Sequence, residues 1–252
     1  MKYKAVIFDL DGTAIPALPN GAPSDRLINT LKSKKGTLYF SCATGRAWTF
    51  SKHIMRALDL KDPCIISAGT QIVDPQTGNI LWQVLIDPYD VTQVIKLLNP
   101  YSYEILVNDE YPGDGKPAAD RDHNFAINYI NAQAVSETHA TKICKKLVAV
   151  KGVTSTKVHS QTPGRIDLHI THSMATKKHA VGKLCEMLEI ATSETIGVGD
   201  GLNDLHLFSG VGYKIAMGNA VPELQDQADR IIDSLEHDGL AAFIEELTTE
   251  YV

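Results

Sequence analysis

Two acidic residues separated by one position, Asp9 and Asp11, directly follow a short apolar run, Ala5 to Phe8, and precede Gly12 and Thr13. A short apolar run bounded by turn residues is typical of a strand that is buried on both faces. Carboxylates this close repel one another unless a cation or a shared proton intervenes, and such oxygen ligands suit Mg²⁺. The pattern indicates either a magnesium site or a simple turn, because Asp and Gly also favour turns.

A second apolar run that ends in acids lies at residues 197–204, where Asp200 and Asp204 flank Gly201 and Asn203. Glycine lets the backbone turn tightly beneath a bound ion. The segment lacks the third glycine of a dinucleotide-binding fingerprint, and the chain contains no Walker-type phosphate loop. Two strand-to-acid turns in one chain favour a metal site over a plain acidic turn.

These segments resemble two motifs of the haloacid dehalogenase-like phosphohydrolases. Asp9-Leu10-Asp11-Gly12-Thr13 is similar to the first motif, in which the first Asp is the phosphorylated nucleophile and the second is the general acid and base. Residues 197–204 are similar to the fourth motif, whose acids ligate and support magnesium while Asn203 would point at the phosphoryl group. The resemblance implies a Mg²⁺ site at Asp9, Asp11, Asp200 and Asp204, with a backbone carbonyl near Asp11 among the ligands.

Phosphoryl transfer also needs fixed donors for the charge on the phosphoryl oxygens. Thr44 and Gly45, which resemble the second motif, could bind a phosphate oxygen through a hydroxyl and a backbone amide. Lys177, in a segment similar to the third motif, could place an ammonium beside the carboxylates and bind the phosphate. Lys178 is the alternative position, and a solvated surface charge is the ordinary role of either lysine. With Asp9 and Asp11, Thr44 and Lys177 complete the expected catalytic set.

The C-terminal residues 214–220 and 237–240 resemble the closing pattern of subgroup IIB, the Cof-type proteins, which carry a mixed α/β cap and include many sugar phosphatases. One position departs from that subgroup. Asn-Gly commonly follows its third strand, whereas this chain has Ala68-Gly69. A substrate contact from this position is therefore in doubt.

Regular alternation of strand and helix patterns predicts an α/β fold with a Rossmann-like parallel core sheet. A helix capped by Ser24 and stopped at Gly36 is expected after the first strand. The further core elements are expected as strands at 37–42, 64–67, 195–198, 213–216 and 230–232 and as helices around 50–58, 180–188 and 239–247. The predicted core is discontinuous and comprises residues 1–83 and 173–252.

Residues 84–172 are predicted to form an inserted α+β cap domain that selects the substrate. A hairpin at 71–73 and 80–82 leads into it. The cap should contain an antiparallel sheet with helices on one face, built from helices around 91–98 and 136–147, strands at 103–107, 153–159 and 165–171, and a long loop at 108–124.

Polar cap residues have two possible roles. A His-x-x-His pair, His169 and His172, could be read as a metal site, but positions i and i+3 of a strand point to opposite faces. Arg121, His123 and Arg165 could meet a polar or anionic substrate, although solvated surface charge is the simpler interpretation of each.

Composition excludes several classes of protein. The 252 residues are 44% hydrophobic and 21% charged, without a long apolar stretch or a secretory signal, so we expect a cytoplasmic protein without a membrane role. A net charge of -6 argues against a nucleic-acid partner. Four widely spaced cysteines without a Cys-x-x-Cys pair are expected to be reduced core residues.

The resemblance therefore implies a magnesium-dependent phosphoric monoester hydrolase that acts on a small phosphorylated metabolite, foremost a sugar phosphate, through an aspartyl-phosphate. One alternative is a phosphomutase that uses the same aspartyl-phosphate. Another is a binding or regulatory protein that keeps the fold without turnover. The sequence names neither the substrate nor the oligomeric state.

Overall fold

Five parallel strands form the central sheet, in the order β13-β12-β11-β1-β2. The computed structural model describes residues 2–18, 20–108, 116–117, 127–160 and 162–250. The strands are β1 (Ala5–Phe8), β2 (Tyr39–Cys42), β11 (Thr195–Gly199), β12 (Tyr213–Ala216) and β13 (Arg230–Ile231). β1 pairs with β2 on one side and with β11 on the other, so the strand order reverses beside β1. Open α/β sheets bind ligands at such switch points.

β1 is buried on both faces, as its sequence predicts. Val6 and Phe8 pack in one apolar cluster, which includes residues of three helices, whereas Ile7 packs in a second cluster on the opposite face. The first cluster takes side chains from α1 (Asp25–Ser33), α2 (Trp48–Ala57) and α8 (Gly239–Glu250), and the second from α5 (Lys177–Leu188) and α6 (Asp204–Phe208). The predicted α/β class is confirmed.

The first helix begins as predicted and ends earlier than predicted. The Ser24 hydroxyl accepts a hydrogen bond from the Leu27 amide at 3.1 Å, as an N-cap residue does. The helix then ends at Ser33, and Gly36 lies in the following turn with φ +81°. The glycine therefore belongs to the turn after the helix.

The predicted third parallel strand is only loosely joined to the parallel sheet. β3 (Cys64–Ile66) pairs antiparallel with β4 (Gln71–Val73), which pairs with β5 (Ile80–Gln83), so the predicted hairpin is present. A single bridge between Ala43 and Ile65 links β3 to the end of β2. On this edge of β2, the Phe40 amide donates to the Asp62 carboxylate at 2.8 Å. A side chain thus completes the free edge of β2.

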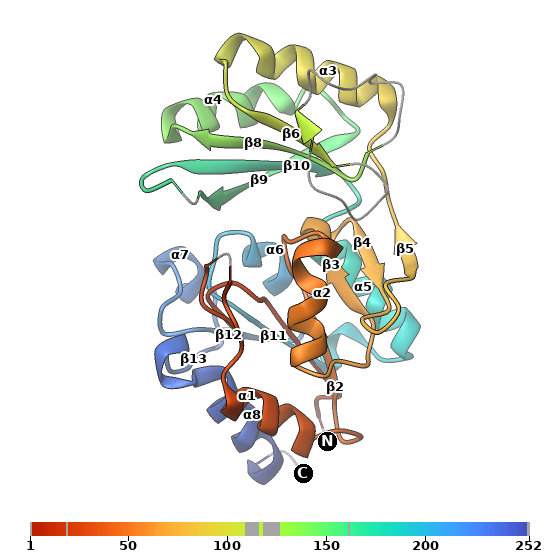
Figure 1. Ribbon diagram of the computed structural model, residues 1–252, viewed down its shortest axis with the longest axis vertical. Coiled ribbons are helices and arrows are strands. Elements are labelled where there is room, and N and C mark those ends of the chain that lie inside the picture. The colour runs from red at the N-terminus through yellow and green to blue at the C-terminus, as the bar shows by residue number, and fades with distance from the viewer. Residues whose placement is uncertain (1, 19, 109–115, 118–126, 161, 251–252) are drawn as a thin grey trace.

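A second, antiparallel sheet lies above the parallel one, with two helices on its far side (Figure 1). Its order is β7-β6-β8-β10-β9. The elements are α3 (Pro88–Leu98), β6 (Ile105–Asn108), β7 (Lys116–Pro117), β8 (Tyr129–Val135), α4 (Glu137–Leu147), β9 (Val153–His159) and β10 (Ile166–His172). The apolar cluster between this sheet and its helices is separate from the clusters of the parallel sheet. The predicted antiparallel arrangement with helices on one face is present, while the boundaries 84–172 stay a prediction.

Two details of this region differ from the sequence prediction. β8 was not predicted, and its pairing with β10 is irregular, with a positive φ of +50° at Ala134. The predicted loop 108–124 falls mostly outside the described residues, and its described part includes β7.

The remaining elements are short. They are α7 (Pro222–Gln225) and the 3₁₀ turns η1 (Ser67–Gly69), η2 (Asn99–Tyr101), η4 (Thr192–Glu194) and η5 (Leu235–His237). All four cysteines are free, and three of them are buried. Across the described residues, no helix has the length and apolar character needed to cross a membrane.

Candidate active site

Three neighbouring strands end at the same level, and the predicted site residues follow them. Phe8 at the end of β1 is paired with Cys42 of β2 and with Val198 of β11. The Asp9 amide continues this ladder by donating to the Val198 carbonyl at 2.9 Å. Asp9, Thr44 and Asp200 therefore leave the sheet at one edge.

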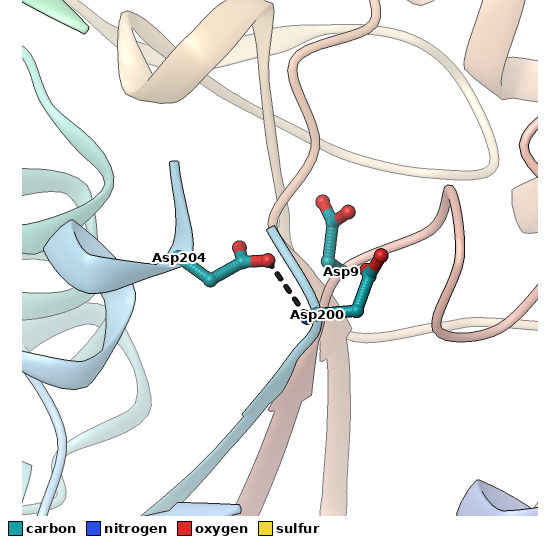
Figure 2. Close-up of side chains that lie close together, drawn as sticks. All are labelled: Asp9, Asp200 and Asp204. Carbon is teal, nitrogen blue, oxygen red and sulfur yellow. Dashed lines mark hydrogen bonds between the residues drawn. The ribbon is translucent and has the colours of Figure 1, made fainter. Parts of the chain in front are cut away.

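Three carboxylates meet at this edge. Asp9, Asp200 and Asp204 each offer an oxygen atom, and these oxygens lie within 4.8 Å of one another. Figure 2 shows Asp9 and Asp200 at the ends of adjacent strands and Asp204 reaching in from α6. Among the described residues, this is the only cluster of acidic, His and Cys side chains with such geometry.

Lys177 is the cation of the cluster. Its buried ammonium donates to Asp9 Oδ1 at 2.8 Å and to Asp204 Oδ1 at 2.6 Å. Burial lowers the pKa of Lys177, but the two carboxylates outweigh burial and raise that pKa above its usual value. Lys178 is exposed, so of the two lysines considered from the sequence only Lys177 reaches the acids.

Asp204 has a supporting position. Its Oδ2 accepts from the backbone amides of Asp200 and Gly201, both at 3.1 Å, while its Oδ1 accepts from Lys177. Both oxygens therefore already have protein donors. Asp204 fixes the turn after β11 and the lysine, and this leaves Asp9 and Asp200 as the carboxylates best placed to face an ion.

Asp200 is held from the loop after β1. The Thr13 hydroxyl donates to Asp200 Oδ1 at 2.8 Å. Gly12 packs against the Asp200 carboxylate and has φ +80°. A Cβ at position 12 would lie 2.1 Å from Asp200 Oδ2, so only glycine fits there. Asn219 also fixes this loop, because its amide donates to the Gly12 carbonyl at 2.8 Å. The sequence alone predicted no role for Thr13 or Asn219.

The charges of the cluster are not balanced by the described protein groups. Three carboxylates face one ammonium, which leaves two formal negative charges. Burial, more than any neighbour, raises the pKa of Asp9 well above its usual value, and burial followed by the Asp204 charge raises the pKa of Asp200 to about 7. A set of oxygen ligands with two uncompensated negative charges fits a hard divalent cation such as Mg²⁺.

Asp11 does not join the cluster. Arg46 donates through Nε to Asp11 Oδ2 at 2.7 Å and through Nη2 to Oδ1 at 2.5 Å, a two-pronged ion pair. The resemblance placed Asp11 in the metal set. In the structure its side chain instead pairs with Arg46, which lies far along the chain but close in space, and a metal role for Asp11 stays a prediction. Each opening acid has its own protein cation.

Thr44 and its neighbours shape the edge beside Asp9. The buried Thr44 hydroxyl accepts from the Arg46 amide at 3.1 Å and keeps its own hydrogen for another acceptor.

The turn after β3 has an unusual backbone. Ala68 has φ +60°, a left-handed conformation that Asn adopts more readily than Ala. At the next position, a Cβ on Gly69 would lie 2.4 Å from the Lys177 backbone nitrogen. The turn after β3 therefore packs directly on the start of α5.

A small cavity connects this edge with the antiparallel sheet. It is lined by Gly45, Ala68, Thr156, His169, Lys177, Asn203 and His206. Three predicted phosphate-binding residues thus line the cavity: Gly45, Lys177 and Asn203. Thr156, His169 and His206 also line it, and the sequence did not predict them beside the phosphate site.

The two cap histidines have separate surroundings. His169 lines the cavity, whereas His172 Nδ1 accepts from the Met174 amide at 3.1 Å. Arg165 is exposed, and Arg121 and His123 lie outside the described residues. These separate surroundings fit the strand alternation that argued against a His169–His172 metal site in the sequence.

The chain is similar to known hydrolases along most of its length. A family model for haloacid dehalogenase-like hydrolases matches residues 6–244. The HMP-PP phosphatase of Enterobacter sp. strain 638 is 26% identical over 237 residues, which cover 86% of this chain and 85% of that protein.

Solved structures share the fold. A phosphatase of the haloalkanoate superfamily from Bacteroides thetaiotaomicron gives a TM-score of 0.82 at 19% identity and covers 98% of this chain and 95% of its own. A subclass IIB sugar phosphatase gives a TM-score of 0.82 at 16% identity, with 97% and 99% of the two chains covered.

Replacing Lys177 should destabilise the fold strongly. Lys177→Met leaves the buried Asp9 and Asp204 carboxylates without their cation, and breaking a buried ion pair typically costs ~3–5 kcal/mol. Urea unfolding without divalent metal at pH 7.5 measures this loss. Lys178→Met, one position along the same helix, is the matched control and should stay within ~0.5 kcal/mol of wild type. Equal losses in the two variants would contradict the assignment.

The raised pKa of Asp200 predicts a pH-dependent stability. A carboxyl whose folded pKa lies above its unfolded value takes up a proton on folding, so its contribution to stability falls as pH rises between the two values, from about 4 to about 7. In a chelating buffer, Tm should therefore be lower at pH 8 than at pH 5.5. Asp200→Asn should flatten this part of the profile, and Mg²⁺ at pH 8 should raise Tm more in wild type than in the variant. Identical profiles for the two proteins would refute the prediction.

Proposed function

The chain belongs to the haloacid dehalogenase-like hydrolases, and from this premise we propose that it is a magnesium-dependent phosphatase that hydrolyses a sugar phosphate through an aspartyl-phosphate. The observation that carries the proposal is the buried cluster of Asp9, Asp200 and Asp204 around Lys177 at the ends of the central strands. Its relatives include phosphatases, which supports the assignment to the phosphoric monoester hydrolases.

Asp9 would act as the nucleophile. Lys177 binds Asp9 Oδ1 and thereby holds the carboxylate in one orientation. The other oxygen would attack phosphorus, so that an oxygen–phosphorus bond forms while the bond to the leaving oxygen breaks. A water would then attack the aspartyl-phosphate, releasing inorganic phosphate and restoring Asp9.

Asp11 would carry the proton. It lies two residues beyond Asp9 and is oriented by Arg46. In the first step Asp11 would protonate the leaving alcohol, and in the second it would take a proton from the attacking water. Arg46 is then a positioning residue, because it fixes the side chain that moves the proton.

The phosphoryl oxygens would meet several donors. These are the Thr44 hydroxyl, the Gly45 amide, the Asn203 side chain and the Lys177 ammonium, three of which line the same cavity. Asp9 and Asp200 would hold Mg²⁺, which supplies charge stabilisation for the transferring group. Asp204 and Thr13 keep these ligands in place.

Residues 84–172 would serve as the cap that selects the substrate. The antiparallel sheet of this segment lies over the parallel sheet (Figure 1), and Thr156 and His169 line the cavity beside Lys177. A cap in this position can exclude bulk water and contact the leaving group.

Phosphate release tests the proposed function. With para-nitrophenyl phosphate and a panel of sugar phosphates, wild type should release phosphate in Mg²⁺ and lose this activity in excess chelator. Asp9→Asn should lower kcat by ~10³-fold or more, as expected for loss of a nucleophile. Asp226→Asn, an exposed acid on the turn after α7, is the matched control and should retain wild-type rates.

Two results would count against the proposal. Full turnover in chelator would show that the reaction needs no metal. Unchanged turnover in Asp9→Asn would show that Asp9 is not the nucleophile. Phosphate release without added sugar bisphosphate separates a phosphatase from a phosphomutase, and the absence of any turnover would indicate a binding protein.

A further inference from the structure

A cavity of about 430 Å³ lies between the loop after β1 and the N-terminal turns of α1 and α8. Pockets that bind small molecules typically have volumes of ~300–1,000 Å³. This cavity, which we name the α1–α8 cavity, shares no lining residue with the cavity beside Lys177. The two helices lie side by side at the end of the molecule opposite the antiparallel sheet (Figure 1). The α1–α8 cavity is therefore separate from the proposed substrate site.

The lining of this cavity combines apolar surface with two carboxylates. Leu27 of α1, Leu235 of η5 and Leu240 of α8 contribute apolar surface, and Glu236 and Asp238 contribute the carboxylates. Among the described residues that line the cavity, none is Lys, Arg or His. Within the described parts of the chain, neither carboxylate accepts a hydrogen bond or forms an ion pair. A ligand can therefore meet an apolar wall and two uncompensated acids at once.

The net charge of the lining is negative. Helix N-termini carry about half a positive charge each, so α1 and α8 together offset about one of the two carboxylate charges. The exposed Arg26 of α1 donates to both Glu245 oxygens, at 3.2 and 2.7 Å, and this pairing raises the pKa of Arg26 more than the Asp238 charge does. Glu245 therefore compensates Arg26. A cation fits the charge of the cavity, and an apolar body on that cation fits its leucines.

Two hydrogen-bonded connections run from the cavity to the proposed metal site. Thr13 lines the cavity, and its hydroxyl donates to Asp200 Oδ1 at 2.8 Å. Leu235 also lines it, and its amide donates to Asn219 Oδ1 at 2.8 Å, while the Asn219 side-chain amide donates to the Gly12 carbonyl at 2.8 Å. Gly12 packs against the Asp200 carboxylate. A ligand that contacts Thr13 and Leu235 therefore restrains both supports of Asp200.

We propose that the α1–α8 cavity is a regulatory site for a small organic cation, a primary ammonium on an apolar chain, and that its occupation strengthens Mg²⁺ binding at Asp200. The ammonium donates to the carboxylates of Glu236 and Asp238, while the chain packs on the three leucines. When the ligand already restrains Thr13, less conformational freedom is left to lose as Asp200 binds the ion. The coupling rests on the proposed magnesium site, whereas binding of the cation does not.

Three probes with one chain length test which charge the cavity selects. They are n-hexylammonium chloride, 1-hexanol and sodium hexanoate, titrated calorimetrically into wild type in chelating buffer at pH 7.5 and constant ionic strength. The ammonium should bind at least ~10-fold more tightly than the alcohol, because a hydrogen bond to a charged group is worth about that factor or more. Hexanoate should bind more weakly still. Equal affinities for the three probes, or no binding of the ammonium, would overturn the proposal.

A double variant locates the bound probe. Glu236→Gln with Asp238→Asn removes both charges at nearly constant size, and Asn tolerates the left-handed backbone of position 238, where φ is +55°. This variant should bind n-hexylammonium at least ~10-fold more weakly than wild type. Glu223→Gln with Asp226→Asn removes two exposed acids in and after α7, so it controls for net charge and should bind as wild type does. Undiminished affinity in the first variant would place the ammonium elsewhere, for example at the acidic cluster of the catalytic edge, and would refute the site.

Magnesium titration tests the coupling. In buffer without chelator, saturating n-hexylammonium should lower the Kd of wild type for Mg²⁺ by ~5-fold, and Mg²⁺ should lower the Kd for the ammonium by the same factor, because linkage is reciprocal. The Glu236→Gln, Asp238→Asn variant should keep the wild-type Kd for Mg²⁺ and show no response to the ammonium. An unchanged or raised Kd for Mg²⁺ in wild type would refute the coupling. If wild type binds no Mg²⁺, the proposed function fails, and the titrations in chelating buffer alone decide whether the cavity binds the cation.

Discussion

The ammonium of Lys177, buried between Asp9 and Asp204, is the interaction on which the candidate site depends. It joins the ends of three elements, since Asp9 follows β1, Lys177 begins α5 and Asp204 begins α6. A buried ion is costly unless its partners are well placed, so these elements must pack in register for the lysine to be tolerated. The neighbouring parts of the site are held by the same residues. Asp204 fixes the turn that carries Asp200, and Gly69 packs on Lys177, the first residue of α5.

Electrostatics give the two opening acids different surroundings. Asp9 belongs to a buried cluster in which three carboxylates face a single lysine, which favours a divalent cation beside Asp9. Asp11, two residues away, instead pairs with Arg46. One short turn thus presents two carboxylates with different partners: Asp9 is held by Lys177, and Asp11 is oriented by Arg46. This division is the physical basis for assigning them the roles of nucleophile and proton carrier.

Local patterns predicted the elements, and contacts across the chain decided the site. The apolar run before Asp9 was sufficient to predict a strand buried on both faces, because Ile7 and Phe8 have to pack on opposite sides. The Asp11–Arg46 pair could not be derived from spacing, since it depends on where β2 places the following loop. β8 was not predicted, although residues 130–133 alternate between apolar and polar side chains. The antiparallel pairing of β3 with β4, and the Asp62 side chain as acceptor for the Phe40 amide of β2, are contacts that the strand pattern at 64–67 did not indicate.

The most direct test of the account is to locate the phosphoryl group during turnover. Asp11→Asn removes the proposed proton carrier and keeps the proposed nucleophile, and loss of a general acid or base slows a step typically by ~10²–10⁴-fold. With an activated aryl phosphate, whose leaving group needs little protonation, a phosphoenzyme should form and then hydrolyse slowly. Mass spectrometry of the trapped protein should place the phosphoryl group on Asp9. A phosphoryl group on another residue, or none on the protein while phosphate is being released, would contradict the account.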